Sequence, residues 1–388
     1  MNSPLFQPET FRKEFPHTTE KGIYFNHAAL SPLPERTAAA AQHSLESRQK
    51  LPVDDFMSLD FPVMEQTRSR LANLIAAAGG SRIAFTPNTS FALSIIANGF
   101  PFGPGDEVLL YEEEFPSNVY PWLVQQARGV KVMRFSGENG CFSLDDVRRA
   151  LNPNTRILAL SAVQFVSGFR ADLPVLSEIC RANGTFLVVD AIQALGHSPV
   201  EVLAWGIDAL CSGCHKWLMT PQGLGFLYMS EAFQERISVT AKGWLSVASV
   251  WELFDTEQPL NPGMSRFEPG TFNLPAIHGL NQSLALLEEA GYNNIRRHVL
   301  RLGDLLHEKL TGTGLQLYGP HEPERRSAIR TYRLPAHIDP HALYETLCRA
   351  GLYLSVRNGL LRFSPYFYNT EAETEKAAAL VTDCLLRS

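Results

Sequence analysis

Short, continuously apolar runs alternate with amphipathic stretches through the middle of the chain, and this alternation restricts the fold more than any other feature. Apolar runs without internal alternation are typical of strands that are covered on both faces. They occupy residues 83–85, 108–111, 130–135, 157–161, 186–190, 209–212 and 225–229. Helix-like segments lie between them, at 90–98, 116–127, 144–150 and 173–182. Strands that alternate with helices predict an α/β fold with a mainly parallel sheet.

The pattern changes near residue 280, which predicts a second domain. A long helical stretch at 280–310 is followed by a strand-like segment at 328–334, a helical one at 340–350 and a final helix at 372–387. We therefore expect a large domain over residues 18–280 and a smaller α+β domain over residues 281–388. Residues 1–17 are expected to form an N-terminal arm.

Composition excludes several classes of protein. Lys and Arg number 34 against 40 Asp and Glu, a net charge of -6, so nothing favours binding to nucleic acid or to an anionic membrane. No apolar stretch approaches the roughly 20 residues of a membrane span. Six cysteines in 388 residues are too few for a disulfide framework, and the start lacks the pattern of a signal peptide. We expect a soluble cytoplasmic protein.

An aspartate and a lysine at consecutive strand ends give the strongest chemical signal. Asp190 ends the apolar run 186–190, and Lys216 closely follows the run 209–212. Ligands of such sheets bind beyond the C-terminal ends of the strands, where a carboxylate with little water needs a cationic partner. Pyridoxal phosphate (PLP) fits both residues, because its ring nitrogen pairs with an Asp and a Lys forms its Schiff base. A helix-capping Asp and a solvated Lys would explain either residue alone.

Further segments carry chemistry of the same kind. Thr89 and Ser90 open a predicted helix, whose free N–H groups attract phosphate, although a plain N-cap explains them as well. Arg362 offers the planar, permanently charged fork that binds a carboxylate in bidentate fashion. Cys211, Cys214 and His215 could suggest half of a zinc site, but no second pair of ligands follows, so we expect no metal.

The ordered set of these motifs resembles the class V aminotransferase group of fold type I PLP enzymes. Its relatives include cysteine desulfurases, kynureninases and isopenicillin-N-epimerase-like proteins. The resemblance spans residues 24–368 and follows the motif order YFNHAA (24–29), NTSFA (88–92), EFPSN (114–118), FLVVDAIQ (186–193), SGCHKWL (212–218), RFEPGT (266–271) and SVRNGLLRFSP (355–365). It implies a large domain with a mainly parallel sheet and a smaller C-terminal domain.

The resemblance assigns roles to individual residues of this chain. Lys216 and Asp190 are the expected catalytic residues. The expected cofactor-binding residues are Thr89, Ser90, Phe115, Asp190, Gln193, Ser212, His215, Lys216 and Thr271. The substrate, a small amino acid, is expected to meet Arg362, Arg357, Asn26, His27 and Gln164, with Trp244 as a further pocket residue. Thr271 is expected to reach the site of a neighbouring subunit, which implies a homodimer with shared active sites.

A missing cysteine separates this chain from one branch of the family. Desulfurases carry a nucleophilic Cys on a loop between the equivalents of Arg357 and Arg362, where this chain has only residues 358–361 and no Cys. Cys348 and Cys384 fall in predicted helices. We therefore expect an aminotransferase that stands closest to the epimerase-like branch. An epimerase-like isomerase, a C–S lyase without a catalytic Cys, and a non-catalytic binder of cofactor or amino acid remain alternatives.

Overall fold

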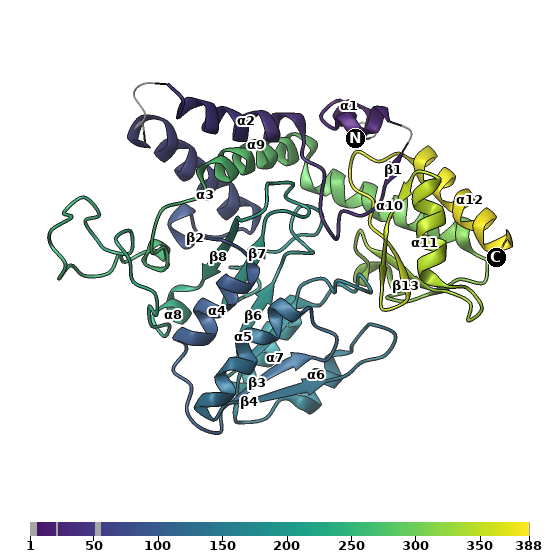
Figure 1. Cartoon of the computed structure of the whole chain (residues 1–388). Helices are drawn as coiled ribbons and strands as arrows, with labels where there is room; N and C mark the ends of the chain where they lie inside the picture. The colour runs from purple at the N-terminus through teal and green to yellow at the C-terminus, as the bar shows by residue number, and fades with distance from the viewer. Residues whose placement is uncertain (1–5, 21, 51–55, 388) are drawn as a thin grey trace, which may run out of the picture.

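A seven-stranded mixed sheet forms the centre of the larger part of the molecule (Figure 1). The computed structural model describes residues 6–20, 22–50 and 56–387. The strand order is β2 (Ile83–Thr86), β8 (Gly225–Met229), β7 (Ala209–Gly213), β6 (Phe186–Asp190), β5 (Thr155–Ser161), β3 (Glu107–Tyr111) and β4 (Lys131–Phe135). Only β8 runs antiparallel to its neighbours among these strands. Each strand coincides with one of the predicted apolar runs, which confirms the α/β prediction.

Both faces of this sheet are buried, which explains why its strands are apolar without alternation. Neighbouring residues of a strand point to opposite faces. Val188 and Val189 of β6 accordingly belong to two different hydrophobic clusters. The cluster of Val188 includes residues of α4 (Thr89–Gly99) and α5 (Tyr120–Leu123). The cluster of Val189 includes residues of α6 (Leu144–Ala150) and α7 (Leu173–Asn183).

The predicted helical stretch at 280–310 is two helices, α9 (Leu274–Ala290) and α10 (Tyr292–Leu310). Gly291 separates them with a φ of 78°, a conformation that favours glycine. Helix α9 packs against α2 (Glu35–Ser47) and α3 (Phe61–Leu74) of the larger part. The predicted domain boundary at residue 280 therefore falls within a helix, and residues 1–5 of the predicted arm lie outside the described residues.

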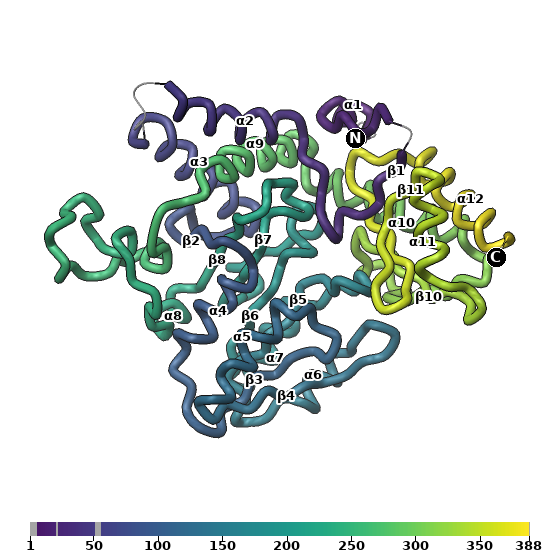
Figure 2. Tube along the Cα trace, in the orientation of Figure 1, coloured from purple at the N-terminus to yellow at the C-terminus, as the bar shows by residue number. Residues whose placement is uncertain are grey.

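A smaller α+β unit completes the fold. Its antiparallel sheet has the order β12 (Ser355–Arg357), β13 (Leu360–Phe363), β10 (Arg330–Arg333) and β9 (Gln316–Leu317). Helices α11 (Pro340–Arg349) and α12 (Glu371–Arg387) lie beside it (Figure 1). The N-terminal β1 (Ile23–Tyr24) pairs in parallel with β11 (Leu352–Tyr353), so the N-terminal segment lies beside the smaller unit (Figure 2). Both predicted helices that contain Cys348 and Cys384 are present.

Short elements connect these units. They are α1 (Glu9–Arg12), α8 (Glu231–Gln234), a π-helical turn (Phe56–Asp60), and 3₁₀ turns at Pro16–Thr19, Gly80–Arg82, Pro116–Asn118, Val124–Arg128, Met264–Phe267 and Pro323–Arg325. Over the ranges that the structure describes, no helix is long and apolar enough to cross a membrane.

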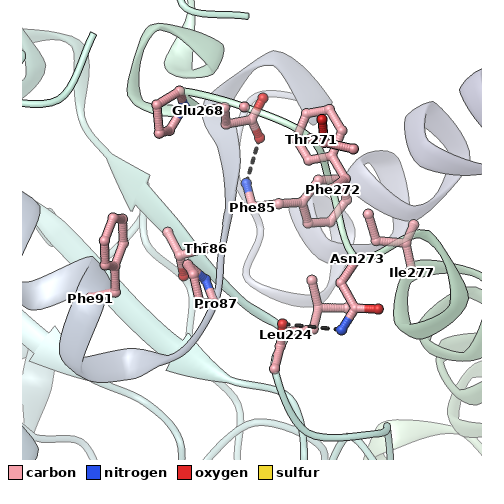
Figure 3. Close-up of a pocket in the computed structure, with 13 residues that line it drawn as sticks. Phe85, Thr86, Pro87, Phe91, Leu224, Glu268, Thr271, Phe272, Asn273 and Ile277 are labelled. Atoms are coloured by element: carbon pink, nitrogen blue, oxygen red, sulfur yellow. Dashed lines mark hydrogen bonds between the residues drawn. The ribbon is translucent and has the colours of Figure 1, made fainter. Parts of the chain in front are cut away.

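A buried ion pair fixes the segment between α8 and α9 to the sheet. Arg68 of α3 donates to both carboxylate oxygens of Glu268, over 2.8 and 2.9 Å. The Glu268 Oε1 atom also accepts the backbone N–H of Phe85 in β2 at 2.5 Å, as Figure 3 shows. Both charged side chains are almost fully buried, so each one depends on the other for its charge balance.

We predict that Glu268→Ala lowers the free energy of unfolding by about 3–5 kcal/mol, because it leaves a buried guanidinium without its counter-ion. Urea denaturation followed by circular dichroism measures the change. Glu65→Ala is the matched control, since Glu65 pairs with the same arginine but is half exposed and its loss should cost less than about 1 kcal/mol. Equal losses for the two variants would contradict the prediction.

Candidate active site

A cavity of about 230 Å³ lies at the C-terminal ends of β6 and β7. It gathers residues from widely separated segments of the chain. The lining residues are Ala28, Ala29, Asn88, Thr89, Ser90, Phe115, Ser117, Phe165, Asp190, Ile192, Gln193, His215, Lys216, Arg357 and Arg362. The fold thus brings most of the predicted site residues into one cavity, at the edge of the sheet where such folds bind ligands.

Asp190 is the last residue of β6 and is 1% exposed. Its Oδ1 atom accepts the backbone N–H of Ile192 at 3.0 Å. Burial raises the pKa of Asp190 to about 7, and the carboxylate of Glu114 raises it further, while the Ile192 hydrogen bond and Lys216 oppose the shift. A cation placed in the cavity would restore the charged form of this carboxylate.

Lys216 follows β7 and is 8% exposed. Its Nζ atom lies 5.3 Å from the centre of the Phe115 ring. Burial lowers the pKa of Lys216 to about 8; Asp190 opposes this shift, whereas Arg362 and Arg357 add to it. No described carboxylate lies within salt-bridge distance of its Nζ atom. A neutral, nucleophilic amine is therefore accessible near neutral pH.

The N-terminus of α4 contributes Asn88, Thr89 and Ser90 to the cavity lining. Asn88 caps the helix through a 2.9 Å hydrogen bond from the Phe91 N–H to its Oδ1 atom. The Thr89 hydroxyl is buried and has no hydrogen-bond partner among the described residues. A Cβ atom on Gly213 would lie 3.2 Å from that hydroxyl and 3.3 Å from the His215 ring, so the absent side chain leaves the space open. An orphaned donor beside a helix N-terminus is suited to a phosphate group.

Arg362 of β13 also lines the cavity and is 1% exposed. It donates from Nε to the Ser355 hydroxyl at 3.1 Å and from Nη1 to the Phe165 carbonyl at 2.5 Å. Burial, together with the positive charge of Arg357, lowers the pKa of Arg362 to about 9. Its guanidinium is thus held in a fixed orientation without an acidic partner among the described residues, as a binding site for a carboxylate requires.

Other predicted residues have different surroundings. Gln193 lines the cavity, but its amide donates to the Ala28 carbonyl at 2.9 Å and accepts from Trp217 at 2.8 Å. The Ser212 hydroxyl donates to the Gly213 carbonyl, and Ser212 is not among the lining residues. His27 is bonded through Nδ1 to the Ser364 carbonyl and through Nε2 to the Tyr368 hydroxyl. The cofactor and substrate roles assigned to these residues stay predictions.

Further predicted residues also lie outside the cavity lining. Asn26 precedes the lining residues Ala28 and Ala29. The Gln164 amide donates to Glu114 Oε1 at 2.8 Å. Trp244 lines a separate surface cavity. Their contact with a substrate stays a prediction.

Thr271 lines a second cavity of about 320 Å³ (Figure 3). The segment from Glu268 to Asn273 forms one wall and Phe91 of α4 belongs to the other. Residues 88–90, which precede Phe91, line the first cavity. The two cavities therefore flank the same helix N-terminus, and Thr271 does not line the first cavity of its own chain.

Sequence reasoning missed several groups of this site. Phe165 and Ile192 line the cavity, but apolar residues carry no chemical signal in a sequence. Glu114 lies behind it, where its carboxylate accepts from the Ser161 N–H at 2.7 Å and the Ser161 hydroxyl at 2.5 Å. Its place in the EFPSN motif was the signal that could have found it. Among the described residues, no group of three or more potential ligands could hold a metal ion.

Comparisons with known proteins agree with this geometry. A family model described as aminotransferase class V matches residues 23–376, so the chain belongs to the class V aminotransferase family. The chain is 29% identical over 331 residues to a probable cysteine desulfurase of Methanothermobacter thermautotrophicus, covering 80% of this chain and 81% of the relative. It is 27% identical over 392 residues to a probable cysteine desulfurase of Pyrococcus abyssi, covering 95% of each.

A solved structure shows the same fold throughout. The apo structure of cysteine desulfurase from Thermococcus onnurineus NA1 superposes with a TM-score of 0.90 at 25% identity and covers 100% of both chains. The molecule therefore has fold type I of the PLP-dependent enzymes. Because these relatives are desulfurases, the expected closeness to the epimerase-like branch is not supported.

The pKa of Lys216 predicts how its amine reacts. We expect the rate of modification of the apoprotein by a small aldehyde to rise with pH to a plateau, with its midpoint at about pH 8, because only the neutral amine attacks and this pKa is about 8. Solvent-exposed lysines should continue to gain reactivity to about pH 10. Borohydride trapping and peptide mass spectrometry give both profiles. A Lys216 profile that follows those of exposed lysines would contradict the burial argument.

Neighbouring charges should move this midpoint in opposite directions. Asp190→Asn removes the charge that raises the pKa of Lys216, so the midpoint should fall below pH 8. Arg357→Met removes a charge that lowers it, so the midpoint should rise. The same trapping measurement serves both variants. Shifts of the same sign in both would show that another interaction controls the amine.

Proposed function

We propose that this chain is a PLP-dependent enzyme that acts on a small amino acid, with transamination as the first choice of reaction. The observation that carries the proposal is the single cavity in which Asp190, Lys216 and Arg362 are all buried and none has an ion-pair partner within 4.0 Å among the described residues. Such uncompensated charges are costly in a protein that binds nothing there. A cofactor and a substrate that carry the opposite charges would compensate these three side chains.

The residues present fit PLP. The orphaned Thr89 hydroxyl and the first turn of α4 would hold its phosphate, with His215 nearby. Asp190 would face the ring nitrogen, whose positive charge would keep this carboxylate ionised despite its burial. Phe115, which already lies over the Lys216 amine, would cover the ring. When bound, the group supplies an electron sink for the charge that develops at the amino-acid α-carbon.

Side chains of the protein bind the substrate, move its α-proton and limit the access of water. Arg362 binds the α-carboxylate of the amino acid, in an orientation fixed by Ser355 and the Phe165 carbonyl. Lys216 takes the α-proton on its Nζ atom, because its pKa of about 8 allows it to exchange a proton near neutral pH. Phe115 and Phe165, whose rings are 5.1 Å apart, limit the access of water to this proton.

A C–S lyase that needs no catalytic cysteine is the second candidate, because the relatives named above are a cysteine desulfurase and two probable cysteine desulfurases. No cysteine lies between Arg357 and Arg362, and no described cysteine lines the cavity. A persulfide formed on the enzyme therefore has no place in the proposed chemistry. An epimerase-like isomerase and a non-catalytic binder are the other outcomes that the experiment below distinguishes.

We also propose a homodimer in which each active site includes a residue of the neighbouring subunit. Thr271 lies in a cavity beside the phosphate-binding end of α4 but outside the cavity of its own chain. The connection between α8 and α9 projects from the molecule (Figure 1) and exposes Trp251, Leu253 and Phe254. Exposed apolar groups of this kind mark surfaces that bind a partner. A second copy of the chain would cover them and bring its Thr271 to this site.

The function is tested by the absorbance of the purified holoprotein. We expect a visible band from covalently bound PLP that disappears in Lys216→Ala, while Lys131→Ala, on the exposed edge strand β4, keeps it. Addition of amino acids then separates the reactions. Conversion of the band to the pyridoxamine form indicates an aminotransferase, α-proton exchange alone an epimerase, and release of pyruvate or alanine a lyase. A Lys216→Ala protein that keeps the band, or a wild type that responds to no amino acid, would overturn the proposal.

The dimer is tested by mass in solution. We expect sedimentation to give twice the chain mass of 43.1 kDa. The double variant Leu253→Asp/Phe254→Asp should dissociate and bind PLP at least about tenfold more weakly, because charges placed in an apolar interface are strongly disfavoured. Leu386→Asp, at an exposed site in α12, is the control. A wild-type monomer that still binds PLP would contradict the shared-site prediction.

A further inference from the structure

The β12–β13 hairpin presents two guanidinium groups to one cavity. Ser355 pairs with Arg362, and Arg357 pairs with Leu360. Because side chains alternate along a strand, Arg357 and Arg362 share one face of this hairpin. Val356 and Leu361, on the other face, pack in the hydrophobic cluster of the smaller unit. The two arginines thus stand diagonally across the hairpin, about 7–8 Å apart at their backbones.

The turn makes this presentation rigid. Asn358 and Gly359 form the two-residue connection with φ values of 49° and 75°. Positive φ at both central residues and the Asn-Gly sequence are typical of a type I′ turn, the tightest hairpin connection. Arg362 is further fixed by its bonds to Ser355 and the Phe165 carbonyl. The spacing between the two cations is therefore set by the fold.

The charges that line the cavity do not balance. Its only acidic lining residue is Asp190, whereas Lys216, Arg357 and Arg362 are all basic. The proposed cofactor would occupy Asp190 and Lys216 and place its phosphate at the N-terminus of α4, and the α-carboxylate of a substrate would occupy Arg362. Arg357 is then left without an anion: its guanidinium donates a hydrogen bond to the adjacent Val356 carbonyl, and it has no ion pair with a described residue.

We infer that Arg357 binds a second acidic group, on the side chain of the substrate, and that the enzyme prefers acidic amino acids with a short side chain. This inference rests on the proposed function and adds the substrate class. A carboxylate or sulfinate there would form a charge-assisted, bidentate pair with Arg357. A neutral side chain would leave the guanidinium of Arg357 without an anion.

The test is a spectral titration of the holoprotein with paired amino acids. The acidic ligands are L-aspartate, L-glutamate and L-cysteine sulfinate, and the neutral partners are L-asparagine, L-glutamine and L-alanine. We expect at least one acid to bind 10- to 100-fold more tightly than its neutral partner, the range expected for a hydrogen-bonded charge. The readout is the ratio of the two dissociation constants rather than turnover.

Variants identify the residue responsible. Arg357→Gln should bring the acid-to-amide ratio to within about threefold of one, and Arg357→Lys should restore part of the preference because the charge remains. Arg349→Gln, an exposed arginine of the neighbouring α11, should keep the wild-type ratio. A role of Arg357 in folding alone would change both dissociation constants together and leave their ratio unchanged.

The titration distinguishes an error in the substrate class from an error in the proposed PLP function. If neutral amino acids bind as tightly as their acidic partners, the substrate class is wrong. If Arg357→Gln keeps the preference, Arg357 is not the residue that binds the acidic group. In both cases the PLP function stands. If no amino acid changes the cofactor spectrum, the proposed function is wrong and this inference falls with it.

Discussion

The burial of opposite charges at adjacent strand ends is the constraint on which the rest of this site depends. Burial raises the pKa of Asp190 and lowers that of Lys216, and each residue partly counteracts the shift of the other. Neither charge is compensated by a close ion pair among the described residues. Asp190 ends β6, Lys216 follows β7, and these two strands are paired. The sheet therefore determines where both uncompensated charges lie. A ligand that supplies a cation to Asp190 and an electrophile to Lys216 relieves it.

The sheet was predictable because the same physical rule operates along each of its strands. Strands buried on both faces must be apolar throughout, and helices between them must be amphipathic. The break at Gly291 was not predictable in the same way, because leucine spacing continues through α9 and α10 while one positive φ separates them. Periodicity reports which face of a helix is buried, and it does not report where the helix axis changes direction.

The candidate site was predictable where a residue type has few other uses. An aspartate at the end of one buried strand and a lysine just after the next indicate chemistry when they occur together, and an arginine within a third strand supports it. Gln193 shows the limit of such reasoning, because packing decides which groups its amide meets, here Ala28 and Trp217. Those partners are far apart in the sequence. Phe165 is a similar case: its carbonyl orients Arg362, a role that no side-chain pattern can reveal.

The short Asn358–Gly359 turn explains two features of this hairpin: the absence of a cysteine loop and the position of the unpaired Arg357. Desulfurases carry their nucleophile on a loop at this point, and here a two-residue turn closes the hairpin instead. A tight turn has no length with which to reach into the cavity. It does place Arg357 and Arg362 on one face at a spacing that the strand geometry sets. At this position the chain therefore has no cysteine nucleophile, so any bond broken beyond the α-carbon must depend on the substrate and on Lys216.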